Sequence, residues 1–309
     1  MEKQTWVIQG SKNQKIFLRR YKNKSEEQVK GIVHILHGMA EYGARYGHFA
    51  QFLVEHGYTV YIHDHRKHGK SLQRNERVGI FTNDTWEDMI EDIHHVQKFI
   101  KSNEPETAHI MLGHSMGSVL LRYYLTVYGE EVDRAIIMGT VHSHLLENKA
   151  GAILSAACEA VAPSIRNKAL DYLFVGRMNK TFEPAATEFD WLSRDKKVVD
   201  WYINSPLCGY QYSPRFYKEF AKGLDYVSNE ENIIKTPHIP IALISGDMDP
   251  VGQFMEGVTS VYNMYKRLGY DVDLKSVANA RHEILNEINK EEIYELVLNL
   301  IEGKQDEKR

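Results

Sequence analysis

Ser115, in the pentapeptide GHSMG (113–117), is the residue of this chain best placed to act as a nucleophile. The pattern G-x-S-x-G is weak evidence alone, because roughly one chain in ten of this length would contain it by chance. Here the pentapeptide follows the apolar run HIML and precedes SVLLRYYLTVYG, which favours a helix. A strand, a sharp glycine-bounded turn and a helix would expose the Ser115 hydroxyl and point the helix N-terminus toward it.

A base must take the proton of Ser115 before that hydroxyl can attack at neutral pH. In a strand–turn–helix architecture of this kind, the nucleophile, the acid and the base follow one another in that order along the chain. Of the 15 histidines, only His282 lies C-terminal to the acidic segment ISGDMDP (244–250). We therefore predict that His282 is the base, with a surface histidine in a loop as the alternative.

A carboxylate has to hold His282 in the correct tautomer and stabilise its protonated form. The segment ISGDMDP supplies two candidates, Asp247 and Asp249, directly after an apolar run. Two acids at the end of a strand could also bind a metal or only shape a turn. The residue types and their spacing leave the choice between the two aspartates open.

The negative charge that develops on an attacked carbonyl oxygen needs preorganised N–H donors. One donor is expected from the residue after the nucleophile, which is Met116. The second should come from the loop HGMAE (37–41) after the early apolar run GIVHIL, where Gly38 allows a tight turn. We predict an oxyanion hole formed by the backbone amides of Met39 and Met116.

Short apolar runs along the chain indicate the strands that would position these residues. They are GIVHILHG (31–38), YTVYIHD (58–64), HIMLGHS (109–115), RAIIMGT (134–140), IPIALISGD (239–247) and the weaker DVDLKSV (271–277). Runs this short and apolar on both faces are typical of strands buried in a parallel sheet. Helical patterns recur between them, in RYGHFAQFLVEHG (45–57), TWEDMIEDIHHVQKFI (85–100) and NKEEIYELVLNLI (289–301). We predict an α/β fold, a mostly parallel sheet covered by helices on both faces, with QTWVIQG and QKIFLRRY as an antiparallel edge hairpin.

The alternation of strands and helices stops between about residues 142 and 235. Because this stretch shows no clear strand, we interpret residues 142–235 as a helical cap inserted into a core of residues 1–141 and 236–309. Such insertions commonly cover the ligand crevice of an open α/β sheet. The cap segment AGAILSAACEAVA (150–162) fits two interpretations: an interfacial helix that admits lipid from a membrane, or a lid packed on the core.

The bulk composition excludes several other classes of protein. A hydrophobic content of 43% with 26% charged residues is ordinary for a globular chain, and a net charge of −4 gives no basic face for nucleic acid. Cys158 and Cys208 are too few for a disulfide framework or a zinc site. With no visible secretory leader and no apolar run long enough to span a bilayer, we expect a cytoplasmic protein. The oligomeric state is left open.

The segment HDHRKH (63–68) is the strongest candidate for a metal site, because it holds three histidines and an aspartate. On a strand, His63 and His65 would share one face. The spacing matches neither of the zinc-hydrolase patterns H-x-H-x-D-H and H-E-x-x-H. We therefore expect a structural loop beside the nucleophile, with no metal and no cofactor. Four further histidines are expected on solvated helix and cap surfaces: His94, His95, His142 and His144.

Taken together, these segments resemble the monoacylglycerol lipase and lysophospholipase group of α/β-hydrolases, sometimes classed with serine aminopeptidase-like proteins. The matching segments are HGMAEYGARY (37–46), HDHRKHGKS (63–71), GHSMG (113–117), NSPLCG (204–209), SGDMDPVG (245–252) and ARHEILNE (280–287). They correspond to HG-x-x-E-x-x-x-R-Y, D-x-x-G-H-G-x-S, the elbow, a segment near the end of the family's cap, and the acid and base segments. The resemblance covers most of the chain and implies the α/β-hydrolase fold with a helical cap.

The resemblance also implies roles for individual residues. In the family pattern the acid is the third residue after the glycine at the strand end, here Gly246, which implies Asp249 and leaves Asp247 as a turn former. Glu41 and Arg45 match positions that line the active-site entrance, so a substrate-binding role is implied for both.

Three positions depart from the family pattern. Ser118 replaces a glycine of the elbow and is small enough to fit, and Lys67 stands where a glycine is usual. Leu285 occupies the position of a second histidine that helps to bind the glycerol head in eukaryotic monoacylglycerol lipases. These departures bear on glycerol recognition and not on hydrolysis.

The residues and the resemblance predict a serine hydrolase that cleaves carboxylic esters of monoacylglycerol or lysophospholipid type through an acyl-serine intermediate. The alternatives are a peptidase acting on small peptides and a non-catalytic ligand-binding protein on the same scaffold. Epoxide and haloalkane hydrolysis are disfavoured, because those relatives place an aspartate at the elbow where this chain has Ser115. The expected partners are a small ester or lipid and, through the cap, a transient membrane surface.

Overall fold

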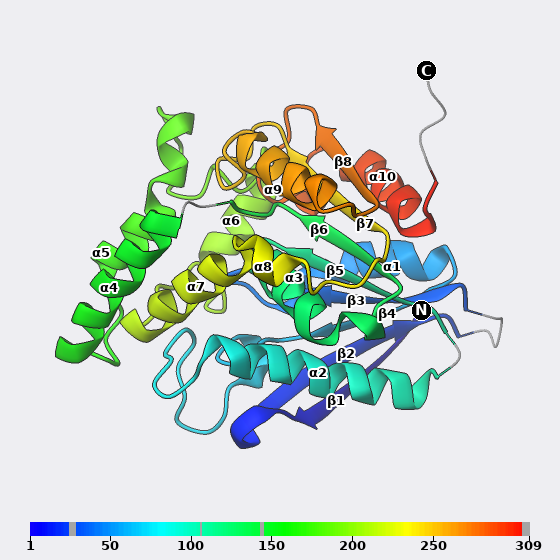
Figure 1. Ribbon diagram of the computed structural model, residues 1–309, viewed down its shortest axis with the longest axis horizontal. Helices are drawn as coiled ribbons and strands as arrows, with labels where there is room; N and C mark the ends of the chain where they lie inside the picture. Colours follow the sequence, from blue (N-terminus) through cyan, green and yellow to red (C-terminus); the bar gives the residue numbers. More distant parts are fainter. Residues whose placement is uncertain (25–28, 106, 143–144, 305–309) are drawn as a thin grey trace.

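The computed structural model describes residues 1–24, 29–105, 107–142 and 145–304, and its strands form one mixed sheet (Figure 1). The strands are β1 (Glu2–Gln9), β2 (Lys15–Lys22), β3 (Gly31–Leu36), β4 (Tyr58–His63), β5 (His109–His114), β6 (Arg134–Met138), β7 (Ile241–Gly246) and β8 (Val272–Val277). Their order is β1-β2-β4-β3-β5-β6-β7-β8. The strands from β4 to β8 in this order pair in parallel, whereas β1 and β2 form the expected antiparallel edge.

Helices cover both faces of the sheet, as predicted (Figure 1). They are α1 (Gly47–Glu55), α2 (Trp86–Asn103), α3 (Met116–Tyr128), α4 (Leu145–Val161), α5 (Lys168–Asp171), α6 (Lys196–Asn204), α7 (Pro214–Val227), α8 (Glu230–Ile233), α9 (Glu256–Arg267) and α10 (Lys290–Glu302). Buried side chains of α2, α3 and α9 pack on one face of the sheet, and those of α1 and α10 pack on the other. The α/β-hydrolase fold that the sequence implied is thus the observed fold.

Local sequence explains where several of these elements begin and end. Every residue of β3, β4, β5 and β7 is buried, which accounts for the continuous apolar runs. At the start of α2, Thr85 and Asp88 form a capping box, in which each side chain accepts the other's backbone N–H. Gly57 follows α1 with φ +91°, a left-handed conformation that glycine adopts without strain.

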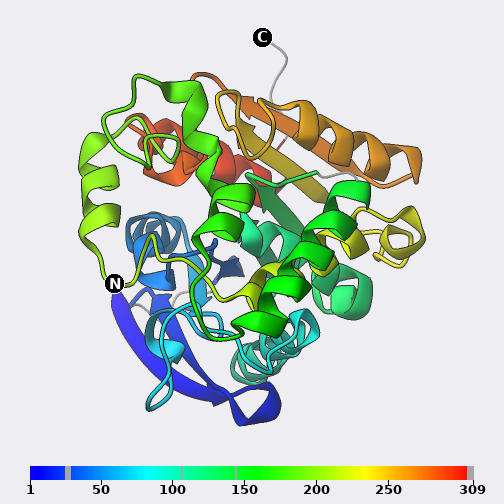
Figure 2. The ribbon, with the colours of Figure 1, turned by 90° about the vertical axis from the view of Figure 1, so that its left-hand side faces the viewer.

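Between β6 and β7 the described chain is helical, from α4 to α8. Helices α4, α5 and α7 form the left-hand side of the molecule in Figure 1, the side that faces the viewer in Figure 2. Helix α4 packs along α7, and α7 also contacts α2 and α3. The division into a core of residues 1–141 and 236–309 and a cap of residues 142–235 is our proposal. No helix in the described part of the chain is long and apolar enough to cross a membrane.

Arg122 of α3 holds both ends of the proposed cap. Its guanidinium donates to the carbonyl of Val141 at 3.0 Å, just before the cap, and to the carbonyl of Val227 at 2.7 Å, at the end of α7. The side chain is buried, and this burial lowers the pKa of Arg122 below its ordinary value. The helix that follows Ser115 therefore anchors the cap at its two connections to the sheet.

Candidate active site

Ser115 lies in a sharp turn between β5 and α3, as the motif predicted. Its backbone has φ +53° and ψ −120°, a conformation that residues other than glycine rarely adopt. The Ser115 N–H donates to the carbonyl of Met138 in β6 at 3.0 Å, and the Ser115 carbonyl accepts the N–H of Ser118 at 2.8 Å. These bonds hold the strained turn in place, and Ser115 lines a cavity of about 740 Å³.

The two glycines of GHSMG permit close contacts that no side chain would allow. A Cβ on Gly117 would lie 2.1 Å from the carbonyl oxygen of Leu36 at the end of β3. A Cβ on Gly113 would lie 2.4 Å from the carbonyl oxygen of Gly117. Because both positions lack a side chain, α3 rests directly on the end of β3 and brings Ser115 beside the loop that follows this strand.

His282 is hydrogen-bonded to Asp249. The Nδ1 atom of His282 lies 3.0 Å from each carboxylate oxygen of Asp249, which also accepts the Ser245 hydroxyl at 3.0 Å and the Val251 N–H at 2.9 Å. Asp249 is fully buried. Burial alone would raise its pKa, but His282 and these donors hold the pKa of Asp249 below its ordinary value. The carboxylate is therefore charged where it faces the imidazole.

Asp247 has a different environment. Its N–H donates to the carbonyl of Val277 at 3.1 Å, in the turn that connects β7 to the segment bearing Asp249. Of the two aspartates of ISGDMDP, the structure brings Asp249 to His282, in agreement with the position implied by the resemblance. The catalytic roles of Ser115, Asp249 and His282 are taken up below as a proposal.

Met39, in the loop after β3, lines the cavity together with Met116. In the described part of the chain, neither amide donates to a backbone carbonyl. The loop is braced at both ends. Gly38 N–H donates to Glu41 Oε1 at 2.6 Å, and Ala40 donates its N–H to the Tyr212 hydroxyl at 2.5 Å. The geometry therefore leaves two backbone donors beside Ser115.

Glu41 and Arg45 belong to a buried network of charges behind this loop. Arg45 donates to Glu41 Oε2 at 2.7 Å and forms two parallel bonds of 2.6 Å to the carboxylate of Glu283. Although burial would raise the pKa of Glu41, Arg45 and His114 hold it well below its ordinary value. Glu41 also lines the cavity, whereas Arg45 is buried behind it. Direct substrate contact by either residue stays a prediction.

His114 links this network to His282. Its Nδ1 atom lies 3.0 Å from the Tyr46 hydroxyl and 3.4 Å from Glu41 Oε1, and its Nε2 atom lies 3.2 Å from the His282 carbonyl. Burial would lower the pKa of His114, but Glu41 and Glu283 raise it above the ordinary value. A protonated His114 can donate from both ring nitrogens, which fits its contacts on both sides.

The histidines of HDHRKH form a chain of hydrogen bonds beneath the same loop. His63 lies between His34 and His65, with nitrogen–nitrogen distances of 2.9 and 3.0 Å. The His65 N–H donates to Nε2 of His37 at 3.0 Å. No three histidine, cysteine or acidic side chains of the described residues are grouped so that they could hold a metal ion. This segment supports the loop, as the structural interpretation expected.

His68 also supports the loop after β3. Its Nε2 atom lies 2.7 Å from the Tyr212 hydroxyl, which in turn accepts the Ala40 N–H. Burial is the main cause that lowers the pKa of His68 to about 3, so the ring is neutral. Lys67, at the position where relatives have glycine, adopts φ +60°.

The expectation that His94 lies on a solvated surface is wrong. Its ring is buried and stacks on Tyr128 with centroids 3.7 Å apart, and its Nδ1 atom lies 3.2 Å from Glu131. The helical periodicity of α2 turns this position toward α3. The ring of His95 is partly buried, and His144 lies outside the described residues.

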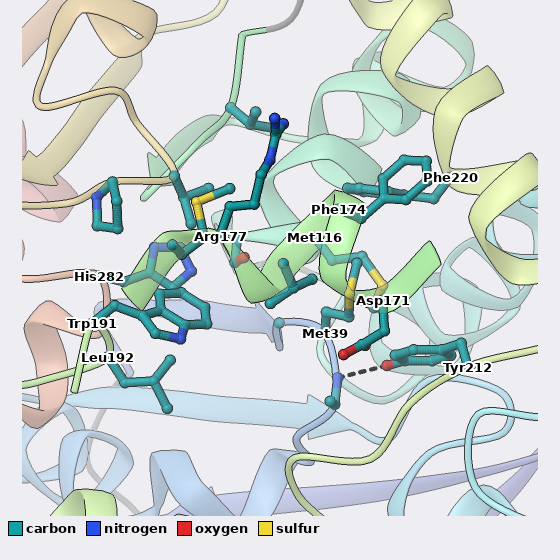
Figure 3. Close-up of a pocket in the computed structure, with 18 of the residues that line it drawn as sticks. Met39, Met116, Asp171, Phe174, Arg177, Trp191, Leu192, Tyr212, Phe220 and His282 are labelled. Atoms are coloured by element: carbon teal, nitrogen blue, oxygen red, sulfur yellow. Dashed lines mark hydrogen bonds between the residues drawn. The ribbon is translucent and has the colours of Figure 1, made fainter. Parts of the chain in front are cut away.

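The cavity that these residues face has a volume of about 740 Å³ (Figure 3). Apolar side chains from α3, the segment after β6 and the cap form much of its wall: Met116, Val141, Leu154, Phe174, Phe220 and Leu224. Polar side chains also reach it: Asp171, Arg177, Glu188, Gln211 and Gln253. His282 and Trp191 lie side by side at one end, while Phe174 and Phe220 lie at the other. The site can thus take an elongated, amphipathic molecule.

The sequence did not predict a role in this site for three residues: His114, Glu283 and Trp191. His114 is the second residue of the elbow motif GHSMG, and this position beside Ser115 is the only feature of the sequence that indicates a role in the site. Glu283 directly follows His282, but only its distant partner Arg45 reveals its role. Trp191 belongs to the cap, whose sequence pattern indicates no position relative to the sheet.

A sequence model of the family described as serine aminopeptidase, S33, matches residues 27–289. A monoacylglycerol lipase of Mycolicibacterium smegmatis is 26% identical over 259 residues, which are 84% of this chain and 83% of that protein. A monoglyceride lipase of Rattus norvegicus is 27% identical over 271 residues, covering 84% of this chain and 81% of the relative.

A solved structure with the same fold is a thermostable carboxyl esterase of Bacillus coagulans in complex with glycerol. It superposes on this chain with a TM-score of 0.90 and 28% sequence identity, covering 98% of this chain and 99% of the esterase. The similarity therefore extends over the sheet and the segment between β6 and β7.

Proposed function

The chain belongs to the serine aminopeptidase S33 family and is a carboxylic ester hydrolase, and on that premise we propose that it cleaves lipid-like esters through an acyl intermediate on Ser115. The observation that carries the proposal is the contact of His282 with Asp249 at 3.0 Å, beside the cavity that Ser115 lines. The strained turn at Ser115 and the two amides of Met39 and Met116 add the remaining parts of such a site.

In the proposed reaction, His282 takes the proton of Ser115 as the hydroxyl oxygen attacks the ester carbonyl. The backbone N–H groups of Met39 and Met116 donate hydrogen bonds to the carbonyl oxygen and stabilise the negative charge that forms on it. The charged carboxylate of Asp249 stabilises the imidazolium of His282. That imidazolium then protonates the leaving alcohol. A water molecule, deprotonated by His282, cleaves the acyl-serine by the same route and releases the acid.

The substrate class that we propose is a single-chain ester of monoacylglycerol or lysophospholipid type. A cavity of about 740 Å³ lies within the usual size range of small-molecule sites. Its apolar wall, with Phe174 and Phe220, suits an acyl chain. Its polar residues, among them Arg177 and Gln253, suit a hydrated head group. Relatives whose names are monoacylglycerol lipase support the same class.

We further propose that the cap touches a membrane surface transiently. Helix α4 and the segment after it expose large apolar side chains: Ile153 is 71% exposed, Val161 86% and Ile165 66%. Helix α4 packs on α7 as well, so an exposed apolar face and a packed face occur on the same helix. This arrangement combines the two interpretations of the cap segment, a lid that is also interfacial.

A peptidase acting on small peptides is the second candidate. The carboxylates of Asp171 and Glu188 line the cavity and could hold the ammonium group of a peptide. Tyr217 donates its hydroxyl to Asp171 at 2.8 Å, and burial is the main cause that raises the pKa of Asp171. Because the Tyr217 hydroxyl already occupies the Asp171 carboxylate, the ester is the better fit.

An ester panel on wild type and Ser115→Ala tests the proposal. The panel contains p-nitrophenyl esters of several chain lengths, monoacylglycerols, lysophospholipids and an aminoacyl p-nitroanilide. We expect Ser115→Ala to lower turnover by a factor on the order of 10⁴–10⁶. Ser260→Ala, in α9, is the matched control and should behave as wild type. Equal rates in wild type and Ser115→Ala would overturn the assignment of Ser115 as the nucleophile, and preference for the anilide would favour the peptidase.

A further inference from the structure

The loop that bears His282 is fastened to the cap. Strand β8 ends at Val277 and α10 begins at Lys290, so this loop lies outside the sheet, where the Ala280 carbonyl accepts the Met248 N–H at 3.0 Å. The segment Asp190–Arg194, here called the strap, runs beside it. The carbonyl of Trp191 accepts the His282 N–H at 3.3 Å, and the carbonyl of Leu192 accepts the Glu283 N–H at 2.7 Å. The backbone of the catalytic loop thus pairs with the backbone of the strap.

Side chains reinforce the strap at its C-terminal end. The Ser193 hydroxyl donates to the carbonyl of Asn286 at 2.8 Å. Arg194 donates to Glu287 at 2.9 Å and to Asn289 at 2.8 Å, and the Glu287 carboxylate is fully buried. An ion pair whose carboxylate is fully buried and accepts several hydrogen bonds does not separate readily. The strap is therefore a fixed part of the cap.

Arg281 fastens the N-terminal part of the strap. Its guanidinium donates to the carbonyl of Asp190 and, at 3.4 Å, to that of Ser193. The same guanidinium lies 4.3 Å from the ring centre of Phe182. The residue before His282 and the residue before Trp191 are thus joined directly, which fixes how the two rings face each other.

The Trp191 side chain reaches the imidazole itself. Its ring centre lies 5.1 Å from that of His282, with an angle of 36° between the planes, and only 7% of Trp191 is exposed. On another side, the ring centre of His114 lies 4.7 Å from His282. Figure 3 shows Trp191 directly beside His282 at the cavity wall. The imidazole of His282 is therefore enclosed by Trp191, His114 and Asp249.

We propose that Trp191 is a positioning residue for the reaction, acting through His282. The indole keeps the imidazole from turning away from Asp249, and its electron-rich face stabilises the positive charge that His282 gains when it takes the serine proton. An aromatic ring near a cation attracts it, with the largest effect where water is excluded. This inference rests on the proposed function, because it requires His282 to be the base.

The test compares Trp191→Phe and Trp191→Met with wild type on a short-chain p-nitrophenyl ester. We expect Trp191→Met to lower kcat by roughly 10-fold, in line with the loss of one cation–π contact, and to change KM by less than about 3-fold. Trp191→Phe keeps an aromatic face and should recover most of kcat. Trp6→Leu, on the distant strand β1, is the control for loss of a tryptophan and should keep wild-type kcat.

A spectroscopic measurement separates positioning from general loosening of the fold. The Nδ1 proton shared by His282 and Asp249 gives a far-downfield proton resonance, which we expect to broaden in Trp191→Met and to persist in Trp191→Phe and Trp6→Leu. Should Trp191→Met fail to fold, fluorinated tryptophans at position 191 keep the packing and weaken the ring face stepwise. kcat then falls with each added fluorine if the inference is correct.

Two results would overturn the inference: wild-type kcat in Trp191→Met, or a level kcat across the fluorinated series. Failure of the inference and failure of the proposed function are distinguishable. If Ser115→Ala is inactive while the Trp191 variants match wild type, the hydrolase proposal stands and the role of Trp191 is wrong. If Ser115→Ala retains its rate, the proposed function itself is wrong.

Discussion

The carboxylates of Asp247 and Asp249 lie two residues apart and differ in what they touch. Asp249 accepts four hydrogen-bond contacts, from His282, Ser245 and Val251, inside the fold. Asp247 is only half-buried and shapes the turn before it. No hydrogen bond joins Asp247 to His282 in the described structure, whereas Asp249, two residues later, lies 3.0 Å from Nδ1 of His282. Substitutions of Asp247 and Asp249 can therefore be compared directly, with Asp247 as the control.

We predict that Asp249→Asn lowers kcat by about 10⁴-fold, while Asp247→Asn stays within about 3-fold of wild type. An asparagine at position 249 would present an amide that favours the wrong tautomer of His282. Steady-state rates on a p-nitrophenyl ester measure both effects. The assignment of the acid is wrong if Asp247→Asn is the inactive variant.

A second prediction concerns Glu41, for which the sequence implied substrate binding. Its carboxylate holds Gly38 N–H at 2.6 Å and the Tyr46 hydroxyl at 2.8 Å, so it braces the loop that carries Met39. If that bracing is its main role, Glu41→Gln should lower kcat by roughly 10–100-fold, less than the roughly 10²–10³ for loss of an oxyanion donor itself, with little change in KM. Glu55→Gln, at the exposed end of α1, is the control. A raised KM with wild-type kcat would instead favour direct substrate contact.

At the residue scale, the sequence predicts a site residue where its position depends on local pattern or on order along the chain. The elbow predicts Ser115, and the order of nucleophile, acid and base predicts His282; the catalytic roles of both stay a proposal. The choice of Asp249 over Asp247 required the family resemblance, because the spacing along the chain is compatible with both aspartates. The contacts of Trp191 and Glu283 join segments far apart in the chain, and no spacing rule reports such contacts before the fold is known.

At the scale of elements, the strands and the helices of the core were predictable because their causes are local. Buried strands need uninterrupted apolar runs, and a capping box needs only Thr85 and Asp88 at the right spacing. The cap obeys no comparable rule. Its helices are placed by contacts with distant groups, such as Arg122 on Val141 and Val227.

The exposed apolar side of α4 leads to a prediction about membranes. Replacing Ile153 and Val161 by serine removes two large apolar groups that the fold does not bury. We expect this double variant to bind phosphatidylcholine vesicles at least about 10-fold more weakly than wild type, because interfacial binding scales with the apolar area inserted. Sedimentation with vesicles measures the bound fraction.

Val7→Ser is the matched control, since Val7 is 60% exposed on β1, away from the cap. Activity on a water-soluble short-chain ester should be unchanged in the double variant, because neither side chain is part of the proposed machinery. Equal vesicle binding by wild type and the double variant would contradict the interfacial interpretation and leave the packed lid.

At the scale of the whole molecule, the buried histidines make stability depend on pH. Burial is the main cause that lowers the pKa of His34 and His68 to about 3 and holds the pKa of His63 and His65 well below the ordinary value. These rings are neutral in the folded protein at pH 5, whereas in the unfolded chain they are protonated below about 6.5. The unfolded state then binds more protons, so stability falls as the pH drops below 6.5.

The loss of stability at low pH is large enough to measure. At pH 5, 1.5 pH units below the unfolded value, His34 and His68 each cost about 2 kcal/mol of unfolding free energy, a large share of the roughly 5–15 kcal/mol typical of a domain. His114, whose pKa is raised, adds stability that is lost only as the pH rises above about 6.5, so it contributes little to the slope below that pH. Burial raises the pKa of Asp92 to about 6, so this carboxyl opposes the histidines below pH 6. Asp249, whose pKa is lowered, adds its own loss of stability only below about pH 4.

We therefore expect chemical denaturation to show stability falling steeply from pH 6.5 to pH 5. His34→Gln should reduce the slope by about 1.4 kcal/mol per pH unit, while exposed His48→Gln should not. A flat profile over this range would mean that the buried histidines do not titrate on unfolding.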